Sequence, residues 1–287
     1  MTRQLFVDLS HWQGEPALSN TAYLALKKCG VKAVIMKATQ GTDWIDVSFA
    51  ANLRRARRHG FLVGVYHFSD GQSGKAQAQH FLKTVRKANG GNLKNLLLVM
   101  DVERNPNPSY GGHVKTSQIK AFAKEVQRVA KRNTFLCYTA EGYWRTLGNP
   151  DLKHLFDGLW QARWDGKRHT CKNKNLPKSP PRAGFGGWYG ARFWQFGTLR
   201  YGKRRIDGNA FYGTMAKMRD LFLTEAPVKP EPVPPPPPDP AVWRGQYNDF
   251  LEAATISIHA LTPDGDGAIE AKADVLDVLE VLEIEGP

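Results

Sequence analysis

The chain has 287 residues, of which 41% are hydrophobic, enough for one large domain or for one large and one small domain. Its formal charge is +13, and the first 240 residues carry 38 Lys or Arg against 17 Asp or Glu. Such a basic body favours an anionic partner, namely nucleic acid, an anionic membrane surface or a cell wall rich in phosphate or carboxylate. No apolar run approaches the roughly 18 residues of a membrane-spanning helix, which excludes a helical membrane protein.

Cysteine usage and the first residues bear on the compartment in which the protein is made. Cys29, Cys137 and Cys171 are odd in number and show no CxxC spacing, so we expect neither a disulfide framework nor a zinc site. Cys29 and Cys137 lie in apolar segments, which predicts buried thiols. Residues 1–4 lack the apolar segment of a secretory signal. These features predict a soluble product made in a reducing compartment.

Strands and helices alternate along the first half of the chain. Short apolar runs predict strands at 5–10, 33–39, 61–68, 96–103 and 134–138. Amphipathic patterns predict helices at 19–28, 46–59, 75–88 and 116–132. The rest of this region predicts aromatic-rich strands at 159–164, 191–196 and 204–207, a surface loop at 167–189 and a closing helix at 210–223. The order predicts an α/β fold, a TIM-like barrel of five βα units plus additional strands, with a doubly wound open sheet as the alternative.

The composition changes after residue 225. Nine of the fifteen residues at 226–240 are proline, which predicts a stiff polyproline linker of at most ~45 Å at ~3.1 Å per residue. Residues 241–287 carry 10 acids and 2 bases, and apolar residues recur there at helical spacing on both sides of a turn at 263–267. We therefore expect a barrel at 1–225, a Pro-rich linker, and a small acidic helical hairpin that oligomerises, docks on the barrel or binds a wall.

Four carboxylates mark predicted strand ends: Asp8, Asp101, Glu103 and Asp207. Asp101 and Glu103 are separated by one residue and therefore share a strand face. If the strands are parallel, all four acids meet at one rim, where their repulsion raises at least one pKa. A protonated acid beside ionised partners is what glycoside hydrolysis needs. Aromatic residues near the same ends suit stacking on sugar rings: Trp12, Tyr66, Phe68, Tyr138, Trp160 and Trp194.

Seven motifs, taken in order over roughly residues 3–223, resemble those of glycoside hydrolase family 25. They are FVDLSHWQG at 6–14, KATQG at 37–41, GVYHF at 64–68, DVE at 101–103, LWQARW at 159–164, WQF at 194–196 and IDGN at 206–209. The members of this family are Chalaropsis-type lysozymes, which are common as bacteriophage endolysins. The resemblance implies a muramidase that hydrolyses the β-1,4 bond between N-acetylmuramic acid and N-acetylglucosamine in bacterial peptidoglycan.

The resemblance also implies roles for individual residues. Glu103 would be the general acid, and Asp101 would orient the 2-acetamido group or stabilise the charged intermediate. Asp8 and Asp207 would shape the electrostatic field around the site and form hydrogen bonds within it. Whether a carboxylate or the substrate's own acetamido group attacks stays open. The implied substrate-binding residues are Lys37, Tyr66, Phe68, Tyr138, Trp160 and Gln195.

Three details qualify this picture. His67 points to the opposite face from Tyr66 and Phe68, so we expect it to be structural. Lys37 is either a saccharide contact or the partner of a pocket acid. Gln40 stands where many relatives carry Glu, and since it cannot ionise it should bind or position. No metal or cofactor is expected.

Two other functions remain open for the chain. One is a non-catalytic carbohydrate-binding or wall-anchoring module, against which intact Asp101 and Glu103 argue. The other is a basic nucleic-acid-binding protein, although no motif of that class is present. The endolysin resemblance implies accumulation in the host bacterial cytoplasm, followed by action on the cell wall.

Overall fold

The computed structural model describes residues 2–14, 17–167, 169–171, 179–201 and 204–224. The Pro-rich linker and the helical hairpin predicted at 226–287 lie outside the described residues, so both stay predictions. Within the described residues, no helix is long and apolar enough to cross a membrane.

Eight strands form a closed barrel, so the alternative of an open doubly wound sheet is wrong. Neighbouring strands pair in the order β1-β10-β9-β7-β6-β5-β4-β2, and β1 also pairs with β2, which closes the ring. The pairs are parallel except that β10 runs antiparallel to both β1 and β9. The strands are β1 (Arg3–Leu9), β2 (Val31–Gln40), β4 (Leu62–Phe68), β5 (Leu97–Asp101), β6 (Phe135–Ala140), β7 (Gly158–Ala162), β9 (Phe193–Tyr201) and β10 (Arg204–Tyr212). Two short strands, β3 (Trp44–Ile45) and β8 (His169–Thr170), pair with β2 and β9.

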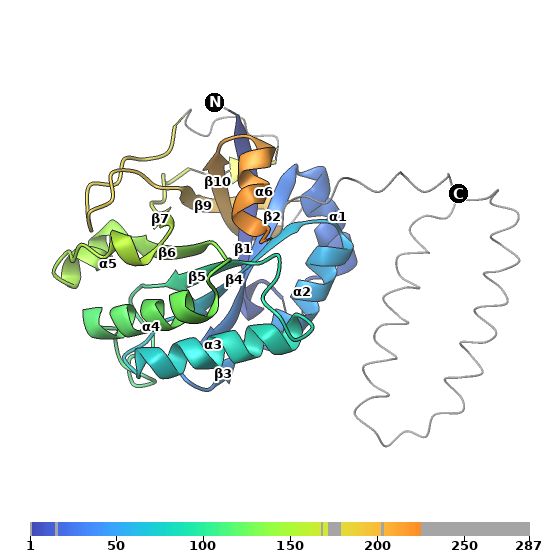
Figure 1. The fold of residues 1–287 in the computed structure, drawn as a ribbon. Helices are drawn as coiled ribbons and strands as arrows, with labels where there is room; N and C mark the ends of the chain where they lie inside the picture. The colour runs from blue at the N-terminus through green and yellow to red at the C-terminus, as the bar shows by residue number, and fades with distance from the viewer. Residues whose placement is uncertain (1, 15–16, 168, 172–178, 202–203, 225–287) are drawn as a thin grey trace, which may run out of the picture. The chain divides into compact units, whose positions relative to one another are not determined.

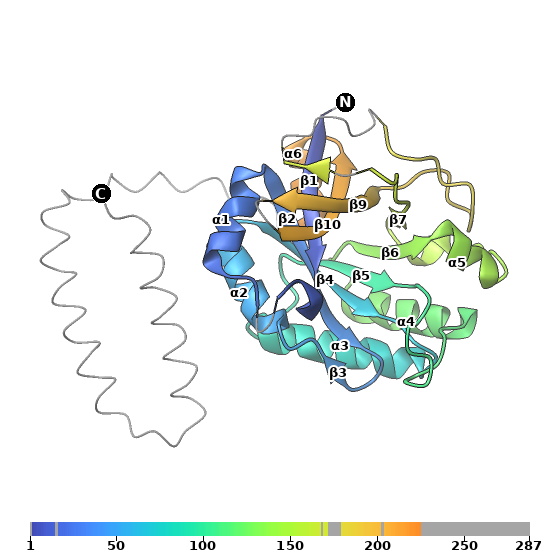
Figure 2. The same cartoon turned by 180° about the vertical axis from the view of Figure 1, so that it is seen from behind.

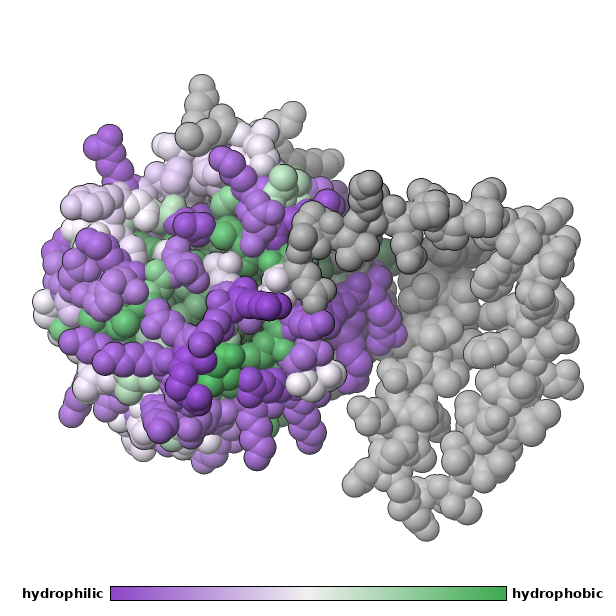
Figure 3. All heavy atoms as spheres, in the orientation of Figure 1, coloured by the Kyte–Doolittle hydropathy of each residue, from purple (hydrophilic) through white to green (hydrophobic). Residues whose placement is uncertain are grey.

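Helices follow most of the parallel strands and lie on the outside of the sheet (Figure 1). They are α1 (Asn20–Lys28), α2 (Phe49–Arg58), α3 (Gly74–Ala88), α4 (Thr116–Val129) and the short α5 (Glu141–Thr146). A further helix, α6 (Met215–Phe222), follows the antiparallel β10 and packs on side chains that point into the barrel. Ser19 caps α1 by accepting a hydrogen bond from the backbone N–H of Ala22. Gly60, just after α2, has a φ of 69°, a conformation in which glycine carries no steric penalty. In the space-filling view, hydrophilic side chains predominate over these helices (Figure 3).

Two apolar layers hold the barrel together. Alternate residues of β5 point to opposite sides, so Leu97 and Val99 pack inside the barrel and Leu98 packs outside it against the helices. Phe222 of α6 joins the inner layer and helps fill the barrel interior. Full burial of each such side chain stabilises the fold by about 1.5–3 kcal/mol. The same alternation turns Asp101 into the barrel and Val102 into the outer layer, as predicted.

Several predicted boundaries in the chain are wrong. The helix expected at 46–59 begins at Phe49, and Val47, which lies before its start, is 65% exposed. The closing helix expected at 210–223 begins at Met215 because the first of these residues still pair in β10. The expected surface loop at 167–189 includes β8 and the buried rings of Phe185 and Trp188. Apolar packing of those rings against the α5 side overrides the polar composition of the segment.

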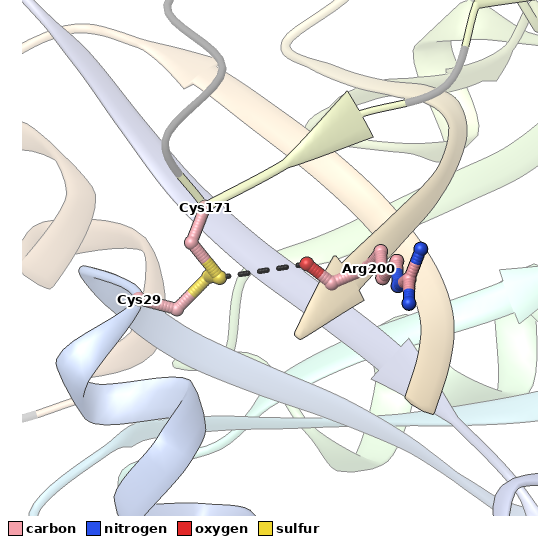
Figure 4. Close-up of a disulfide and its surroundings, with 3 residues drawn as sticks. All are labelled: Cys29, Cys171 and Arg200. Atoms are coloured by element: carbon pink, nitrogen blue, oxygen red, sulfur yellow. Dashed lines mark hydrogen bonds between the residues drawn. A yellow bond between two sulfur atoms is a disulfide. The ribbon is translucent and has the colours of Figure 1, made fainter. Parts of the chain in front are cut away.

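The prediction for Cys29 is also wrong. Cys29 caps the end of α1 and forms a disulfide with Cys171, 142 residues later, with the two Cα atoms 4.8 Å apart (Figure 4). The Cys171 sulfur lies 3.6 Å from the carbonyl oxygen of Arg200, a contact rather than a hydrogen bond because a disulfide sulfur has no proton. Cys137 is a buried free thiol, as predicted. Segments far apart in sequence meet here because β10 pairs with β1, β9 pairs with β10, and β8 pairs with β9, which brings β8 toward α1 (Figure 2).

Candidate active site

A cavity of about 600 Å³ opens at the carboxyl ends of the parallel strands. Segments that follow β1, β5 and β7 contribute to its wall, as expected for a barrel of this type. Every predicted catalytic and substrate-binding residue lines it: Asp8, Lys37, Tyr66, Phe68, Asp101, Glu103, Tyr138, Trp160, Gln195 and Asp207. Of the aromatic residues predicted near the strand ends, Trp194 does not line the cavity. It is 3% exposed, packs on Phe196 and donates from Nε1 to the carbonyl of Arg163.

Asp101 and Glu103 carry the strongest signs of an acid site. Burial raises the pKa of Glu103 to about 7, against the opposing effect of the Lys37 charge. Burial, and then the charge of Glu103, raise the pKa of Asp101 well above its usual value. Both acids therefore hold a proton more readily than a carboxyl group in water does. Glu103 is suited to donate a proton near neutral pH.

Asp8 and Asp207 face each other across β1 and β10. The sequence-based reason for placing Asp207 here was wrong, because Asp207 does not end its strand. It reaches the rim because β10 is antiparallel to β1, which brings an early residue of β10 level with the end of β1. Burial raises the pKa of Asp207 to about 6. Burial, followed by the Asp207 charge, raises the pKa of Asp8.

Two amides stabilise the Asp8 carboxylate. Asn209 Nδ2 donates to Asp8 Oδ1 at 2.6 Å, and Gln195 Nε2 donates to the same oxygen at 3.1 Å. These bonds favour the ionised form and oppose the rise in its pKa. Asp8 is thus held as a fixed hydrogen-bond acceptor in the cavity.

Aromatic residues form the wall beside the acids and are themselves tied to these amides. Tyr138 donates from its hydroxyl to Gln195 Oε1 at 3.0 Å, and Trp160 donates from Nε1 to Asn209 Oδ1 at 2.9 Å. The Tyr138 and Trp160 ring centroids lie 4.8 Å apart in an edge-to-face arrangement. The rings are therefore fixed before a ligand binds.

Lys37 and Gln40 form a linked pair in the cavity wall. Lys37 Nζ donates to Gln40 Oε1 at 2.8 Å and lies over the rings of Trp44 and Phe68, 4.6 and 4.7 Å from their centroids. Burial lowers the pKa of Lys37, while the Asp101, Asp46 and Glu103 charges oppose this effect. Gln40 thus positions the ammonium group, in keeping with its neutral side chain.

His67 is structural, as its strand position predicted. It is fully buried, with Nδ1 2.8 Å from Thr39 Oγ1 and Nε2 2.9 Å from Gln77 Oε1. Burial lowers its pKa to about 3, so the ring is neutral. It supports the strand behind the cavity.

The sequence-based reasoning missed several residues of the site. Asn209 was detectable, since it lies two residues after Asp207 on the same strand. His11 and Asp46 were harder to find, because they are 35 positions apart and meet only in the fold. Trp164 donates from Nε1 to Gln195 Oε1 at 2.9 Å and lines the cavity with a side chain that is 61% exposed. Within the described part of the chain, no cluster of three or more His, Cys, Asp or Glu residues is arranged to hold a metal ion.

The fold and the cavity can now be compared with known proteins. Lysozyme M1 of Streptomyces globisporus is 29% identical over 225 residues, which cover 74% of this chain and 69% of that protein. A family GH25 lysozyme from Aspergillus fumigatus matches with a TM-score of 0.61 at 28% identity, covering 77% of this chain and 100% of that one. A bacterial lysozyme from Streptomyces coelicolor matches with a TM-score of 0.61 at 27% identity, covering 77% of this chain and 98% of that one. Residues 7–201 match the family model of Glycosyl hydrolases family 25, and the chain belongs to that family.

Proposed function

We propose that the protein is a muramidase that hydrolyses the β-1,4 bond between N-acetylmuramic acid and N-acetylglucosamine in peptidoglycan. The observation that carries the proposal is Glu103, a buried acid whose pKa is raised to about 7 in a cavity that three other carboxylates share. Membership of family 25 and relatives named lysozyme or N,O-diacetylmuramidase support the same substrate class. The excess of basic residues suits a substrate embedded in an anionic wall.

Glu103 acts as the general acid and gives its proton to the glycosidic oxygen as the bond breaks. This transfer avoids expulsion of an alkoxide, and positioned acids of this kind accelerate reactions by about 10²–10⁴-fold. Developing positive charge on the sugar is stabilised by the ionised carboxylates of the cavity. After the leaving sugar departs, the Glu103 carboxylate accepts a proton from the attacking water.

Asp101 serves the intermediate. It ends β5, lines the same cavity as Glu103 and is 5% exposed, and its Oδ1 has no hydrogen-bond partner within the described residues. That oxygen is placed to accept the N–H of a 2-acetamido group, which would orient the acetamido oxygen toward the anomeric carbon. A direct attack by a carboxylate is the alternative, and trapping of a covalent glycosyl-enzyme would establish it.

The decisive experiment is mass spectrometry of the fragments released from purified peptidoglycan. A muramidase leaves N-acetylmuramic acid at the new reducing ends, whereas a glucosaminidase leaves N-acetylglucosamine there. Binding to wall fragments without new reducing ends would instead identify a non-catalytic wall-binding module. Preferential salt-sensitive binding to DNA, again without cleavage, would identify the nucleic-acid-binding alternative.

We also propose the finer organisation expected from the sequence. The order of elements from β1 to β7 supports counting the barrel as five βα units with additional strands. The acidic composition of residues 241–287 supports a module that oligomerises, docks or binds the wall, and deletion of 226–287 with measurement of mass and wall binding tests this. Host lysis by a phage, from the host cytoplasm, stays a prediction.

A further inference from the structure

One polar pair in the cavity wall is not explained by the acid chemistry. His11 follows β1 and lines the cavity, and Asp46 follows β3 behind it. His11 Nδ1 lies 2.9 Å from Asp46 Oδ2, and the backbone N–H of His11 donates to the same oxygen at 3.0 Å. The Asp46 side chain is 1% exposed and the His11 side chain 18% exposed.

The pair fixes which ring nitrogen is available to a ligand. Asp46 Oδ1 accepts the backbone N–H of Ser48 at 2.9 Å, so the carboxylate is held from both sides. An ionised carboxylate only accepts, so Nδ1 of His11 must carry the proton that the two share. Nε2 of His11 then accepts a hydrogen bond when the ring is neutral and donates one when it is protonated. Within the described residues, no hydrogen bond to this nitrogen is made.

A purely structural role does not account for the imidazole. The backbone N–H of His11 already ties this turn to Asp46, so the side chain is not needed to hold the loop. The ring lies 4.7 Å from the ring of Trp12, which is 82% exposed, and 5.3 Å from that of Trp44. An exposed indole beside a free imidazole nitrogen suits a sugar ring whose substituent reaches the imidazole.

We propose that His11, positioned by Asp46, binds the 3-O-lactyl group of N-acetylmuramic acid through Nε2. This inference rests on the proposed function. The lactyl group is the chemical difference between the two sugars, and an anionic substituent is repelled by Asp8, Asp101, Glu103 and Asp207. His11 is paired with Asp46 and not with one of those four acids. Its Nε2 donates to a free lactyl carboxylate, or accepts the amide N–H where a stem peptide is attached.

The test measures binding separately from cleavage, with Glu103→Gln as the parent. Calorimetry gives the Kd for a peptide-free tetrasaccharide of alternating N-acetylglucosamine and N-acetylmuramic acid, for its peptide-bearing form, and for an all-N-acetylglucosamine tetrasaccharide. His11→Asn keeps an amide near the Nδ1 position and removes Nε2. We expect it to weaken binding of muramic-acid oligosaccharides about five- to tenfold, the effect of one lost hydrogen bond. Binding of the all-N-acetylglucosamine chain should not change.

Three further variants complete the design. Asp46→Asn should weaken binding of muramic-acid oligosaccharides less than His11→Asn does, because it disturbs only the orientation of the His11 ring. It should likewise leave binding of the all-N-acetylglucosamine chain unchanged. His11→Gln keeps a polar group near Nε2 and should restore part of the affinity. His59→Gln is the control: it removes a histidine that contacts Asn20 through Nε2 at 2.9 Å and does not line the cavity. In enzymes that retain Glu103, His11→Asn should raise KM and leave kcat within about twofold.

The outcomes separate this inference from the proposed function. Equal losses for all three oligosaccharides, or no loss for any of them, would overturn the role of His11. A parent that binds the three ligands equally, while the Glu103 enzyme releases muropeptides, would overturn the inference and leave the function standing. A protein that neither binds nor cleaves muramic-acid glycans would overturn both. Comparison of the two muramic-acid ligands identifies whether the carboxylate or the amide form is bound.

Discussion

Asp8 on β1 lies directly opposite Asp207 on β10, as paired residues of an antiparallel ladder. Like charges placed directly across two strands destabilise a sheet. The protein compensates only in part, through the Asn209 and Gln195 amides that donate to Asp8. The pair therefore lowers the free energy of unfolding. It also places negative charge where positive charge would develop on the sugar in the proposed reaction.

Replacement of the acid tests the central role in the reaction. Glu103→Gln removes the transferable proton but keeps the shape of the side chain, so kcat should fall by at least about 10²–10³-fold. Thermal unfolding of the variant should show a retained fold. An enzyme with normal kcat in this variant would contradict the assignment of Glu103.

The pH dependence of activity follows from the same group. Glu103 must be protonated to act, and its pKa is raised to about 7. Activity on a soluble glycan should therefore decrease as pH rises through about 7. The residual activity of Glu103→Gln should not show this decrease. A profile flat from pH 6 to 9 would show that a different group donates the proton.

Removal of the Asp207 carboxylate should stabilise the protein at alkaline pH. The folded-state pKa of Asp207 is raised from 3.8 to about 6. For such a group the stability is full below pH about 4 and is lost as pH rises through about 6. Asp207→Asn removes this loss, so at pH 8 its free energy of unfolding should exceed that of the wild type by about 1–3 kcal/mol. At pH 3 the two should be similar, and denaturant titrations at both values provide the check. Lower stability of Asp207→Asn at pH 8 would contradict the effect of burial on the pKa of Asp207.

The disulfide should contribute strongly to stability. It closes a segment of 142 residues, and loss of a native disulfide typically costs about 2–5 kcal/mol. Cys29→Ser, Cys171→Ser and the double variant should lose similar amounts, because all three remove the same bond. A thiol assay of denatured protein should find one free thiol before reduction and three after it. Three thiols before reduction would restore the expectation of a reduced Cys29.

Asn209 should matter for both the charge and the packing of the site. Asn209→Leu leaves Trp160 Nε1 without its acceptor and Asp8 without its nearest donor, which should cost about 1–3 kcal/mol and a large part of kcat. Asn209→Asp keeps the acceptor for Trp160 but sets a third carboxylate against Asp8. We expect it to lose activity as the leucine variant does, with most of its stability loss appearing as pH rises. Measurement of kcat and unfolding at pH 5 and 8 separates the two effects.

The sequence determined much of this protein through local patterns. Period-two alternation in 97–103 was enough to put Asp101 and Glu103 on one face, and the same rule turned His67 away from the cavity. Seven short motifs were enough to identify the family, since each lies within a strand or runs from a strand into the segment that directly follows it. Boundaries such as the start of α2 were less accurate, because polar and apolar residues alternate ambiguously at 46–48.

Only the tertiary structure decided how these parts meet. Closure of the barrel, the reversed direction of β10 and the bond between Cys29 and Cys171 are long-range facts without a local signal. The hydrogen bond from Asn209 to Asp8 joins residues that are 201 positions apart in the sequence. Backbone periodicity reports which way a side chain points from its own strand. It cannot report which distant side chain it will meet, because that depends on the packing of the whole chain.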